Sequence, residues 1–499
     1  MEKAWEELER RSAEIEDIVS LIKLASWDQE VLMPTEGGPS RARALATMQA
    51  IAHDRLKDPA VGELLSQLED DDTLDPAKRA SVRVLRRDFD KATKIPEKLV
   101  RELAELEARS YQVWAEARPQ NDFKMLEPYL TRMLELKKEE ADALGWQEER
   151  YDALLDAFEP GMLTSQVETM FSELEQSLRP IVDPIIEAAG EPHPLLQAGY
   201  DTDAQNEFCE WMVAQVGFSF KGGRLDTSPH PFTMEVGPGD VRQTIRPERN
   251  AIMFSIFAGM HETGHALYEQ GIPNEMRGLP VGQVPSLGMH ESQSRLWENQ
   301  VGRSRAFTEF ILPHLAKRFP EQLKGVSAEE FYAAASHPSR SLIRVAADEV
   351  TYNLHVALRF ELEVAMFRDE LDVKDLPGAW NEKMEKWVGI TPPNDSDGVL
   401  QDMHWSIGSL GYFPTYTLGT LYAAALFDKL RSDLGDLTEE IRAGDTSRVL
   451  SWLQEKVYSQ GYLYSATELM ERVLGEPPTA KPFVSYLRAK FEDLYDIKL

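Results

Sequence analysis

From residue 1 to about 215, apolar residues recur at spacings of three and four, which is the period of an amphipathic α-helix. Proline and glycine interrupt the pattern at intervals that suit helices of ordinary length. In the segment 96–117, for example, Leu99, Leu103 and Leu106 share one face behind a leading proline, which predicts a packed surface helix. The interruptions fall at 34–39, 58–59, 75–76, 95–96, 118–119, 159–161 and 191–192.

The stretch 231–246 departs from the helical period. Two runs of alternating residues flank a Gly-Pro-Gly sequence at 237–239, and this pattern predicts a β-hairpin. Side chains alternate across a strand, so Asp240, Arg242 and Thr244 are expected on one face of the second strand.

Nothing in the sequence divides the chain into independent units, because it has no fixed-period repeat, low-complexity tract or Gly/Ser-rich linker. We expect a single domain, 1–499, with an N-terminal helical part at about 1–215 and a second part at about 216–499. The expected fold class is mainly α: a large helical body with a small β-sheet.

The composition of the chain excludes several classes of protein and of binding partner. The chain has 499 residues, 54 Lys+Arg against 85 Asp+Glu and a net charge of −31, and 42% of its residues are hydrophobic, which excludes a disordered chain. It has no basic run, so nucleic acid and anionic membranes are not expected as partners. The single cysteine, Cys209, excludes an internal disulfide and a cysteine-based zinc site.

The acidic start of the chain has neither the basic end nor the apolar centre of a signal peptide. The longest apolar runs are far shorter than the roughly 20 residues that a membrane span requires. We therefore expect a cytoplasmic protein.

The apolar run 251–268 carries the pattern His-Glu-x-x-His. On a helix, His261 and His265 lie one turn apart on the same face, so both imidazoles can bind one ion while Glu262 projects beside it. The pattern predicts the helix of a zinc hydrolase. The alternative, a coincidental polar pair, is disfavoured because unpaired polar groups are costly on an apolar helix.

A catalytic zinc takes three protein ligands and keeps one position for water. Gly271 stands where a metzincin has its third histidine, which excludes that subclass. A second helical segment begins near Met289, after a stretch rich in proline and glycine, and can return beside the first. Glu291 is the preferred third ligand, and Glu298 and His290 are its competitors. Without a metal, Glu291 would be a first-turn acid favoured by the helix dipole.

Two further segments carry polar residues in unusual patterns. The run 340–363 is predicted as one long helix with a narrow polar stripe, which indicates either a cavity wall or a buried ion-pair network. The Gly-rich segment 398–416 is predicted as a loop that brings donors to a site, although His404 alone is more typical of a core histidine. The stripe consists of Arg344, Asp348, Tyr352, His355 and Arg359.

Several segments between residue 27 and about 416 form an ordered set. They are Trp27-Asp28-Gln29-Glu30 with Met33-Pro34, His230-Pro231-Phe232, Asp240-x-Arg242-x-Thr244, His261-Glu262-x-x-His265, His290-Glu291-Ser292-Gln293, Ile343-Arg344-x-x-Ala347-Asp348 and Gly398-x-x-Gln401-Asp402-x-His404-Trp405. In content and order they resemble the carboxypeptidase Taq family of metallocarboxypeptidases. Ala346, where the family often carries Glu, is a departure that affects no expected site residue.

The resemblance implies a nearly all-helical, neurolysin-like fold with a small sheet, a deep substrate groove that contains the metal, and a homodimer. It implies stepwise removal of C-terminal residues, with broad side-chain tolerance, from peptides that have a free C-terminus. It also implies one divalent metal per chain, zinc in the first place and cobalt in some members.

The same resemblance assigns roles to single residues. His261, His265 and Glu291 would be the metal ligands, and Glu262 the general base that takes a proton from the attacking water. Arg344 and Arg242 would bind the terminal carboxylate of the substrate. His404 and Tyr416 would stabilise the oxyanion, with Tyr412 as the alternative phenol.

Two other functions remain open from the sequence. One is an oligopeptidase that resembles the neurolysin and thimet oligopeptidase family and cuts peptides internally. The other is a peptide-binding protein with a structural metal, which is disfavoured because structural zinc normally has four protein ligands.

Overall fold

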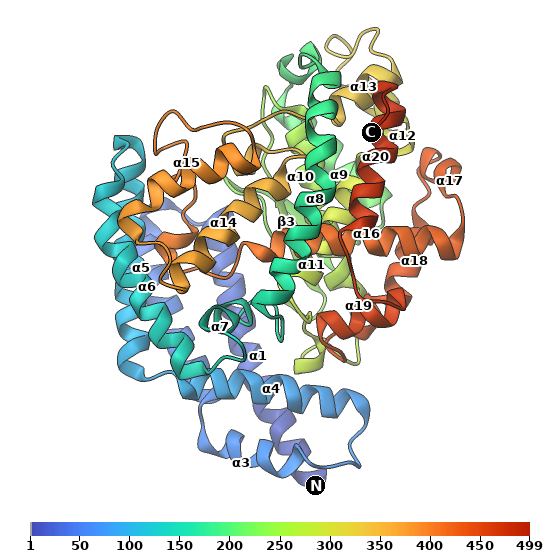
Figure 1. Cartoon of the computed structure of the whole chain (residues 1–499). Helices are drawn as coiled ribbons and strands as arrows, with labels where there is room; N and C mark the ends of the chain where they lie inside the picture. The colour runs from blue at the N-terminus through green and yellow to red at the C-terminus, as the bar shows by residue number, and fades with distance from the viewer. Residues whose placement is uncertain (1) are drawn as a thin grey trace.

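The computed structural model describes residues 2–499 and confirms the predicted class, a mainly helical body with one small sheet (Figure 1). The helices before the sheet are α1 (Glu2–Val31), α2 (Gly38–Leu56), α3 (Pro59–Leu68), α4 (Pro76–Lys94), α5 (Glu97–Gln120), α6 (Phe123–Leu144), α7 (Arg150–Leu155), α8 (Thr164–Ala189) and α9 (Thr202–Gln215). The strands are β1 (Gly223–Thr227), β2 (Thr233–Gly237) and β3 (Asp240–Ile245).

The second half of the chain is again helical. Its longer helical elements are α10 (Ile252–Gly271), α11 (Leu287–Arg295), the π-helix η4 (Leu296–Gly302), α12 (Arg305–Arg318), α13 (Ala328–Ala335), α14 (Tyr352–Phe367), α15 (Leu376–Trp387), α16 (Pro414–Leu434), α17 (Thr438–Arg442), α18 (Ser447–Lys456), α19 (Ala466–Leu474) and α20 (Lys481–Tyr495). Of these, α10, α11 and α16 lie in the middle of the molecule (Figure 1).

The predicted interruptions between the N-terminal helices are confirmed with one displacement. Asp58 and Asp75 cap α3 and α4, because each carboxylate accepts a backbone N–H of the first turn while proline occupies the first helical position. At 118–119 the expected break comes late, since α5 continues through Pro119 to Gln120 and is capped by Asn121, which has a left-handed φ of 55°. The helical pattern therefore outweighs a proline near the helix end.

The predicted hairpin is confirmed and has a partner that the sequence analysis missed. Strands β2 and β3 pair antiparallel, with an irregularity between Glu235 and Gly237. Strand β1 pairs parallel to β3, which gives the order β1-β3-β2. Because β3 and β2 pack against α10, the hairpin lies directly beside the helix that carries the His-Glu-x-x-His pattern.

The prediction of one helix over 340–363 is wrong. The chain forms a short 3₁₀ turn, η5 (Arg344–Ala346), and α14 begins only at Tyr352. Asp348 ends the continuity, since its carboxylate accepts the backbone N–H groups of Ser339, Val350 and Thr351 and thereby fixes a turn. The five polar residues consequently do not form one helical stripe.

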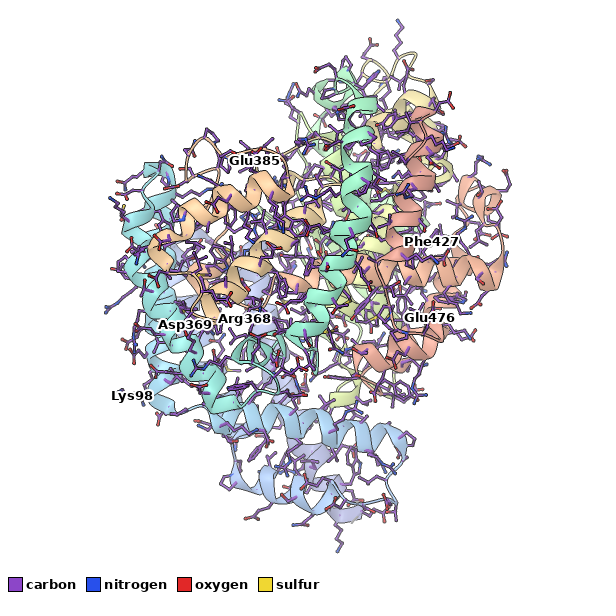
Figure 2. The ribbon with its side chains drawn as sticks, in the orientation of Figure 1. Lys98, Arg368, Asp369, Glu385, Phe427 and Glu476 are labelled. Atoms are coloured by element: carbon purple, nitrogen blue, oxygen red, sulfur yellow. The ribbon has the colours of Figure 1, made fainter. Side chains whose placement is uncertain are left out.

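The buried apolar side chains form two clusters. A small one belongs to α1, α3 and α4, which lie together near the N-terminus at the lower end of Figure 1. The large one includes residues from both sides of position 215, such as Val213 and Val216. Figure 2 shows side chains filling the space between helices, with Lys98, Glu385 and Glu476 at the exterior. The division at about 215 therefore does not separate two cores, and the single-domain organisation stays a prediction.

Within residues 2–499, none of the helices has the length and apolar character needed to cross a membrane. The deep groove that the resemblance implies stays a prediction.

Candidate active site

Three helices meet at very short range in the middle of the molecule, and glycine makes each approach possible. A Cβ on Gly264 of α10 would lie 2.4 Å from the carbonyl oxygen of Gln293 on α11. A Cβ on Gly419 of α16 would lie 2.5 Å from Cγ of Glu291 on α11. Real Cβ atoms do not tolerate such contacts, so both positions require glycine. Helix α11 is held between α10 and α16, and Glu291 lies at the second contact.

This arrangement brings together the two histidines and Glu291. Their nearest ligand atoms all lie within 4.8 Å of one another. Both Nε2 atoms, of His261 and of His265, are 3.4 Å from Oε2 of Glu291. The spacing of one helical turn on α10 and the return of α11 thus produce a cluster of two imidazoles and one carboxylate.

A layer of polar contacts fixes the orientation of the cluster. Nδ1 of His261 lies 2.9 Å from Oε2 of Glu298 on η4, so its Nε2 is directed at Glu291. Nε of Arg295 donates to Oε1 of Glu291 at 2.7 Å, and the hydroxyl of Ser294 donates to Oε2 at 2.9 Å. Glu298, considered above as a ligand, therefore contacts the far nitrogen of His261.

Charges around the cluster favour a cation. Burial opposes ionisation of Glu291, but Arg295 and His261 outweigh it and hold its pKa well below the ordinary value. Burial also disfavours the charged form of His261, yet Glu291 and Glu298 raise its pKa to about 10. The carboxylates thus stabilise one positive charge at the position where a metal would replace the proton.

His290, the other competitor for the third ligand, contacts a different carboxylate. Its Nε2 lies 2.7 Å from Oε1 of Glu269, and its ring stacks on His265 with 4.4 Å between centroids. Burial, together with His290, lowers the pKa of His265 to about 3, so His265 is neutral, as a metal ligand must be.

Glu262 lies beside the cluster and is held by the hairpin. The hydroxyl of Thr233 on β2 donates to its Oε2 at 2.7 Å. Burial raises the pKa of Glu262 above the ordinary carboxyl value. A carboxylate with a raised pKa next to a cluster of metal-ligand type is suited to accept a proton from water.

Arg344 belongs to a buried ion-pair network. Its Nε and Nη2 donate to Oδ1 of Asp402 at 3.2 and 2.8 Å, and Nη1 donates to the hydroxyl of Tyr352 at 2.9 Å. Arg359 binds the other oxygen of Asp402 at 2.6 Å. Arg344 is only 4% exposed. Arg344, Tyr352 and Arg359 therefore form a buried ion-pair network, which is the second interpretation of the polar residues in 340–363. Asp402, which lies outside that segment, joins Arg344 to Arg359.

His404, Tyr412 and Tyr416 surround this network. The Tyr412 and Tyr416 rings have centroids 5.2 Å apart, the His404 and Tyr416 rings 6.5 Å, and the guanidinium of Arg344 lies 5.0 Å from the Tyr416 ring. Burial and Arg344 lower the pKa of His404 to about 4, so its ring is neutral at neutral pH.

Tyr352 joins the network to the histidine cluster. Arg295, which binds Glu291, stacks on the Tyr352 ring at 4.3 Å, and the hydroxyl of that ring accepts from Arg344. The Arg344–Asp402 network and the histidine cluster are thus parts of one connected polar centre.

Arg242 lies in a different group of contacts. It forms an ion pair with Asp240 on the same strand, with Nη2 at 2.7 Å from Oδ2, as expected for residues that share a strand face. Its guanidinium stacks on Trp27 of α1 at 4.3 Å, and Arg224 lies over the same indole at 4.8 Å. Among the contacts found in residues 2–499, Arg242 and Arg344 share no partner.

Sequence reasoning missed three functional contacts. The sequence pattern places Thr233 only within the predicted hairpin and Arg295 only within the second predicted helix. Asp402 appeared only within a motif. A signal existed for Arg295, because it follows Glu291 by four residues on a helix, the spacing of a helical ion pair. Thr233 and Asp402 bind partners far along the chain, for which a single sequence gives no signal.

The resemblance implies a divalent metal, and the residues present fit one. Two imidazole nitrogens and a carboxylate oxygen are the donor set of a catalytic zinc site, which leaves a position for water. Contacts with Glu298 and Arg295 orient these donors, as surrounding carboxylates and donors do in metal sites.

Comparison with known proteins identifies the family. A family model described as carboxypeptidase Taq (M32) metallopeptidase matches residues 7–491. The chain is 42% identical over 507 residues to thermostable carboxypeptidase 1 of Thermus thermophilus, covering 99% of each protein. It is 39% identical to thermostable carboxypeptidase 1 of Pyrococcus furiosus, over 93% of this chain and 94% of that protein.

A solved structure agrees with these matches. The crystal structure of the M32 carboxypeptidase from Deinococcus radiodurans R1 has a TM-score of 0.97 and 39% identity to this chain, covering 99% of this chain and 100% of that one. The resemblance seen in the sequence is confirmed, and the oligopeptidase and binding-protein alternatives lose support. The chain belongs to the carboxypeptidase Taq (M32) family of metallopeptidases and is a metallocarboxypeptidase.

Proposed function

We propose that the protein removes single C-terminal residues from peptides, with broad side-chain tolerance, using one divalent metal held by His261, His265 and Glu291. The observation that carries the proposal is the His-His-Glu cluster beside the buried Glu262 in a member of this family. Zinc is the ion that the donor set favours, with cobalt as the alternative, because borderline nitrogen and oxygen ligands bind both.

When bound, the metal supplies Lewis acidity, which lowers the pKa of a water and polarises the scissile carbonyl. Glu262 takes the proton of that water and then passes it to the leaving amine. The hydrogen bond from Thr233 holds the carboxylate of Glu262 in place beside the cluster during both transfers. The hairpin therefore supports the proton-transfer step through Thr233.

The oxyanion that develops at the carbonyl needs donors where its charge appears. His404 is suited to this role, because a neutral imidazole donates one N–H and holds no competing charge. Tyr416 is the proposed second donor and Tyr412 the alternative, since both phenols face His404.

Arg344 and Arg242 are proposed to bind the terminal carboxylate of the substrate. A guanidinium has five N–H donors, and Arg344 uses three of them on Asp402 and Tyr352, which leaves two. Arg242 uses two on Asp240. Each arginine is oriented by its internal partners and still has donors available for a carboxylate. The edge strand β2 is proposed to align the peptide by strand addition.

Three further expectations complete the proposal. The resemblance implies a homodimer, and the sequence pattern leads us to expect a cytoplasmic location and a single domain of residues 1–499. Light scattering that gives the mass of one chain at working concentration would contradict the dimer.

Mass spectrometry of one peptide during digestion by the metal-loaded enzyme tests the proposal. We expect a ladder of products that lose one C-terminal residue at a time. The same peptide with an amidated C-terminus is the control, because it lacks the charge that the arginines bind, and its cleavage should be slower by roughly 10²-fold. Internal cuts, or equal cleavage of both peptides, would favour the oligopeptidase alternative.

A further inference from the structure

Glu363 on α14 is a buried carboxylate with an unusual set of partners. It is 0% exposed. Its Oε2 accepts the hydroxyl of Tyr151 at 2.6 Å and the backbone N–H of Gly411 at 2.8 Å, and its Oε1 accepts Nε1–H of Trp405 at 2.6 Å. These three donors come from α7, from the 3₁₀ turn η7 (His404–Ile407) and from the loop before α16.

A buried carboxylate is costly unless charged or hydrogen-bonding partners compensate it. No lysine, arginine or histidine of residues 2–499 forms an ion pair with Glu363. Three neutral donors therefore hold the group. An apolar side chain would fill the same space at lower cost, but it would leave the N–H groups of Trp405 and Gly411 buried without a partner.

Two of the three donors adjoin proposed oxyanion residues. Trp405 follows His404 directly, and Gly411 directly precedes Tyr412. One carboxylate thus binds both ends of the segment 404–412. Side-chain packing also holds the segment, because the Trp405 ring packs edge-on against Trp380 with 5.7 Å between ring centroids.

The backbone at Gly411 shows how closely this segment is constrained. Gly411 has a φ of 88°, and a Cβ there would lie 2.7 Å from the backbone carbon of Leu154 on α7. In this conformation, beside α7, the N–H of Gly411 donates to Glu363. The position of Tyr412 is therefore set by α7 and Glu363 together.

We propose that Glu363 is a positioning residue of the active site, which holds His404 and Tyr412 in the orientation that the reaction requires by binding Trp405 and Gly411. The inference rests on the proposed function, because His404 and the tyrosines act on the substrate only if that function holds. Glu363 itself touches no reacting atom.

The third donor provides a matched control. Tyr151 binds the same carboxylate but lies on α7, outside the segment 404–412. Tyr151→Phe removes one buried hydrogen bond to Glu363 and keeps the ring. Trp405→Phe removes another, but it also removes part of the indole that packs on Trp380, so Glu363→Gln, which keeps both rings, is measured beside it. If Glu363 only stabilises the fold, Tyr151→Phe and Glu363→Gln affect turnover alike. If Glu363 positions the segment, Glu363→Gln and Trp405→Phe affect turnover and Tyr151→Phe does not.

The experiment measures kcat and KM on a free-acid peptide for the metal-loaded wild type, Tyr151→Phe, Trp405→Phe and Glu363→Gln, together with melting temperature and metal content. Burial raises the pKa of Glu363 to about 7, so the assay is run at pH 8. We expect Trp405→Phe and Glu363→Gln to lower kcat by roughly 10- to 100-fold with little change in KM. We expect Tyr151→Phe to keep kcat within about two-fold, and metal content to stay unchanged throughout.

Glu363→Gln is informative because its amide has one oxygen and one NH₂ group. Either orientation points the NH₂ group at an N–H donor, of Trp405 or of Gly411, so both ends cannot be held. Equal kcat losses in the two phenylalanine variants, or a normal kcat in Trp405→Phe, would overturn the inference even if Glu363→Gln fails to fold. A wild type without a C-terminal ladder would refute the proposed function instead.

Discussion

Replacement of Gly419 by alanine is expected to displace Glu291 and weaken metal binding. The added Cβ would lie 2.5 Å from Cγ, 2.6 Å from Cβ and 3.1 Å from the backbone carbon of Glu291. Ordinary carbon contacts are about 3.5–4.0 Å, so the new Cβ would be roughly 1 Å too close to Glu291. Rotation of the Glu291 side chain about χ1 moves only Cγ, whereas Cβ and the backbone carbon stay in place. Relief therefore requires α11 and α16 to move apart.

The magnitude follows from the tolerance of a metal site. Ligand distances must stay within about 0.2 Å of their ideal values, and a shift of roughly 1 Å in Glu291 exceeds this several-fold. We expect metal affinity to fall by about 10- to 100-fold or more, comparable with the loss of an orienting contact. Overpacking should also cost about 1–3 kcal/mol of stability.

The assay is a competition titration of the metal-free protein with zinc and a chromogenic chelator, together with thermal melting. Gly378→Ala in α15 is the matched control, because a Cβ there meets nothing within 4 Å. It should bind metal like the wild type and gain up to about 1 kcal/mol, since alanine is the better helix former. Wild-type affinity in Gly419→Ala, combined with a lowered melting temperature, would refute the argument that this contact sets the position of Glu291.

Three further outcomes are expected. Glu262→Gln should keep its metal, measured by elemental analysis, and lose about 10²–10⁴-fold in kcat. Near-normal turnover in this variant would show that Glu262 is not the general base. Asp402→Asn should lower stability in chemical denaturation by roughly 3–5 kcal/mol, because it leaves Arg344 and Arg359 buried without a countercharge; a change below 1 kcal/mol would contradict this. Burial raises the pKa of Glu159 to about 8, so the folded state holds an extra proton and its stability falls as pH rises from about 4.5 to 8. The free energy of unfolding of Glu159→Gln, relative to the wild type, should therefore rise by roughly 3–5 kcal/mol from pH 5 to pH 9, which melting at both pH values tests. A difference that stays constant would show that Glu159 is not the source of this pH dependence.

Local chemistry explains which parts of the fold were predictable. The Asp-Pro pairs at 58–59 and 75–76 cap the helices that they begin, so the sequence contains the helix start itself. The hairpin likewise has its turn in the sequence. Strand β1, in contrast, forms by parallel pairing with β3, and its own residues do not indicate that contact.

The error over 340–363 has a related cause. Periodicity counts Asp348 as one more polar residue on a helical face, whereas its carboxylate binds backbone N–H groups in a turn, so the helix begins only at Tyr352. The partnership of Arg344 with Asp402 joins residues far apart in sequence and cannot be deduced from spacing. The histidines of the cluster were predictable because one helical turn alone brings them together.

The ion pairs of the two proposed carboxylate-binding arginines differ in a way that bears on recognition. Near the sheet, Arg242 and Arg224 are each matched by their own aspartate, Asp240 and Asp226, so the group carries no surplus charge. In the other network Arg344 and Arg359 share the single carboxylate of Asp402, so within the direct ion pairs there is one more positive charge than negative, in a buried setting.

That surplus has a consequence for substrate binding. A protein with a net charge of −31 repels an anionic peptide end at long range, so a local positive charge is needed to bind it. Because burial strengthens the attraction, a carboxylate placed beside Arg344 would complete the charge balance of the network. Arg242 offers an oriented donor without surplus charge. The proposed roles of the two arginines are therefore unequal: we expect Arg344 to attract the carboxylate and Arg242 to contribute to its orientation.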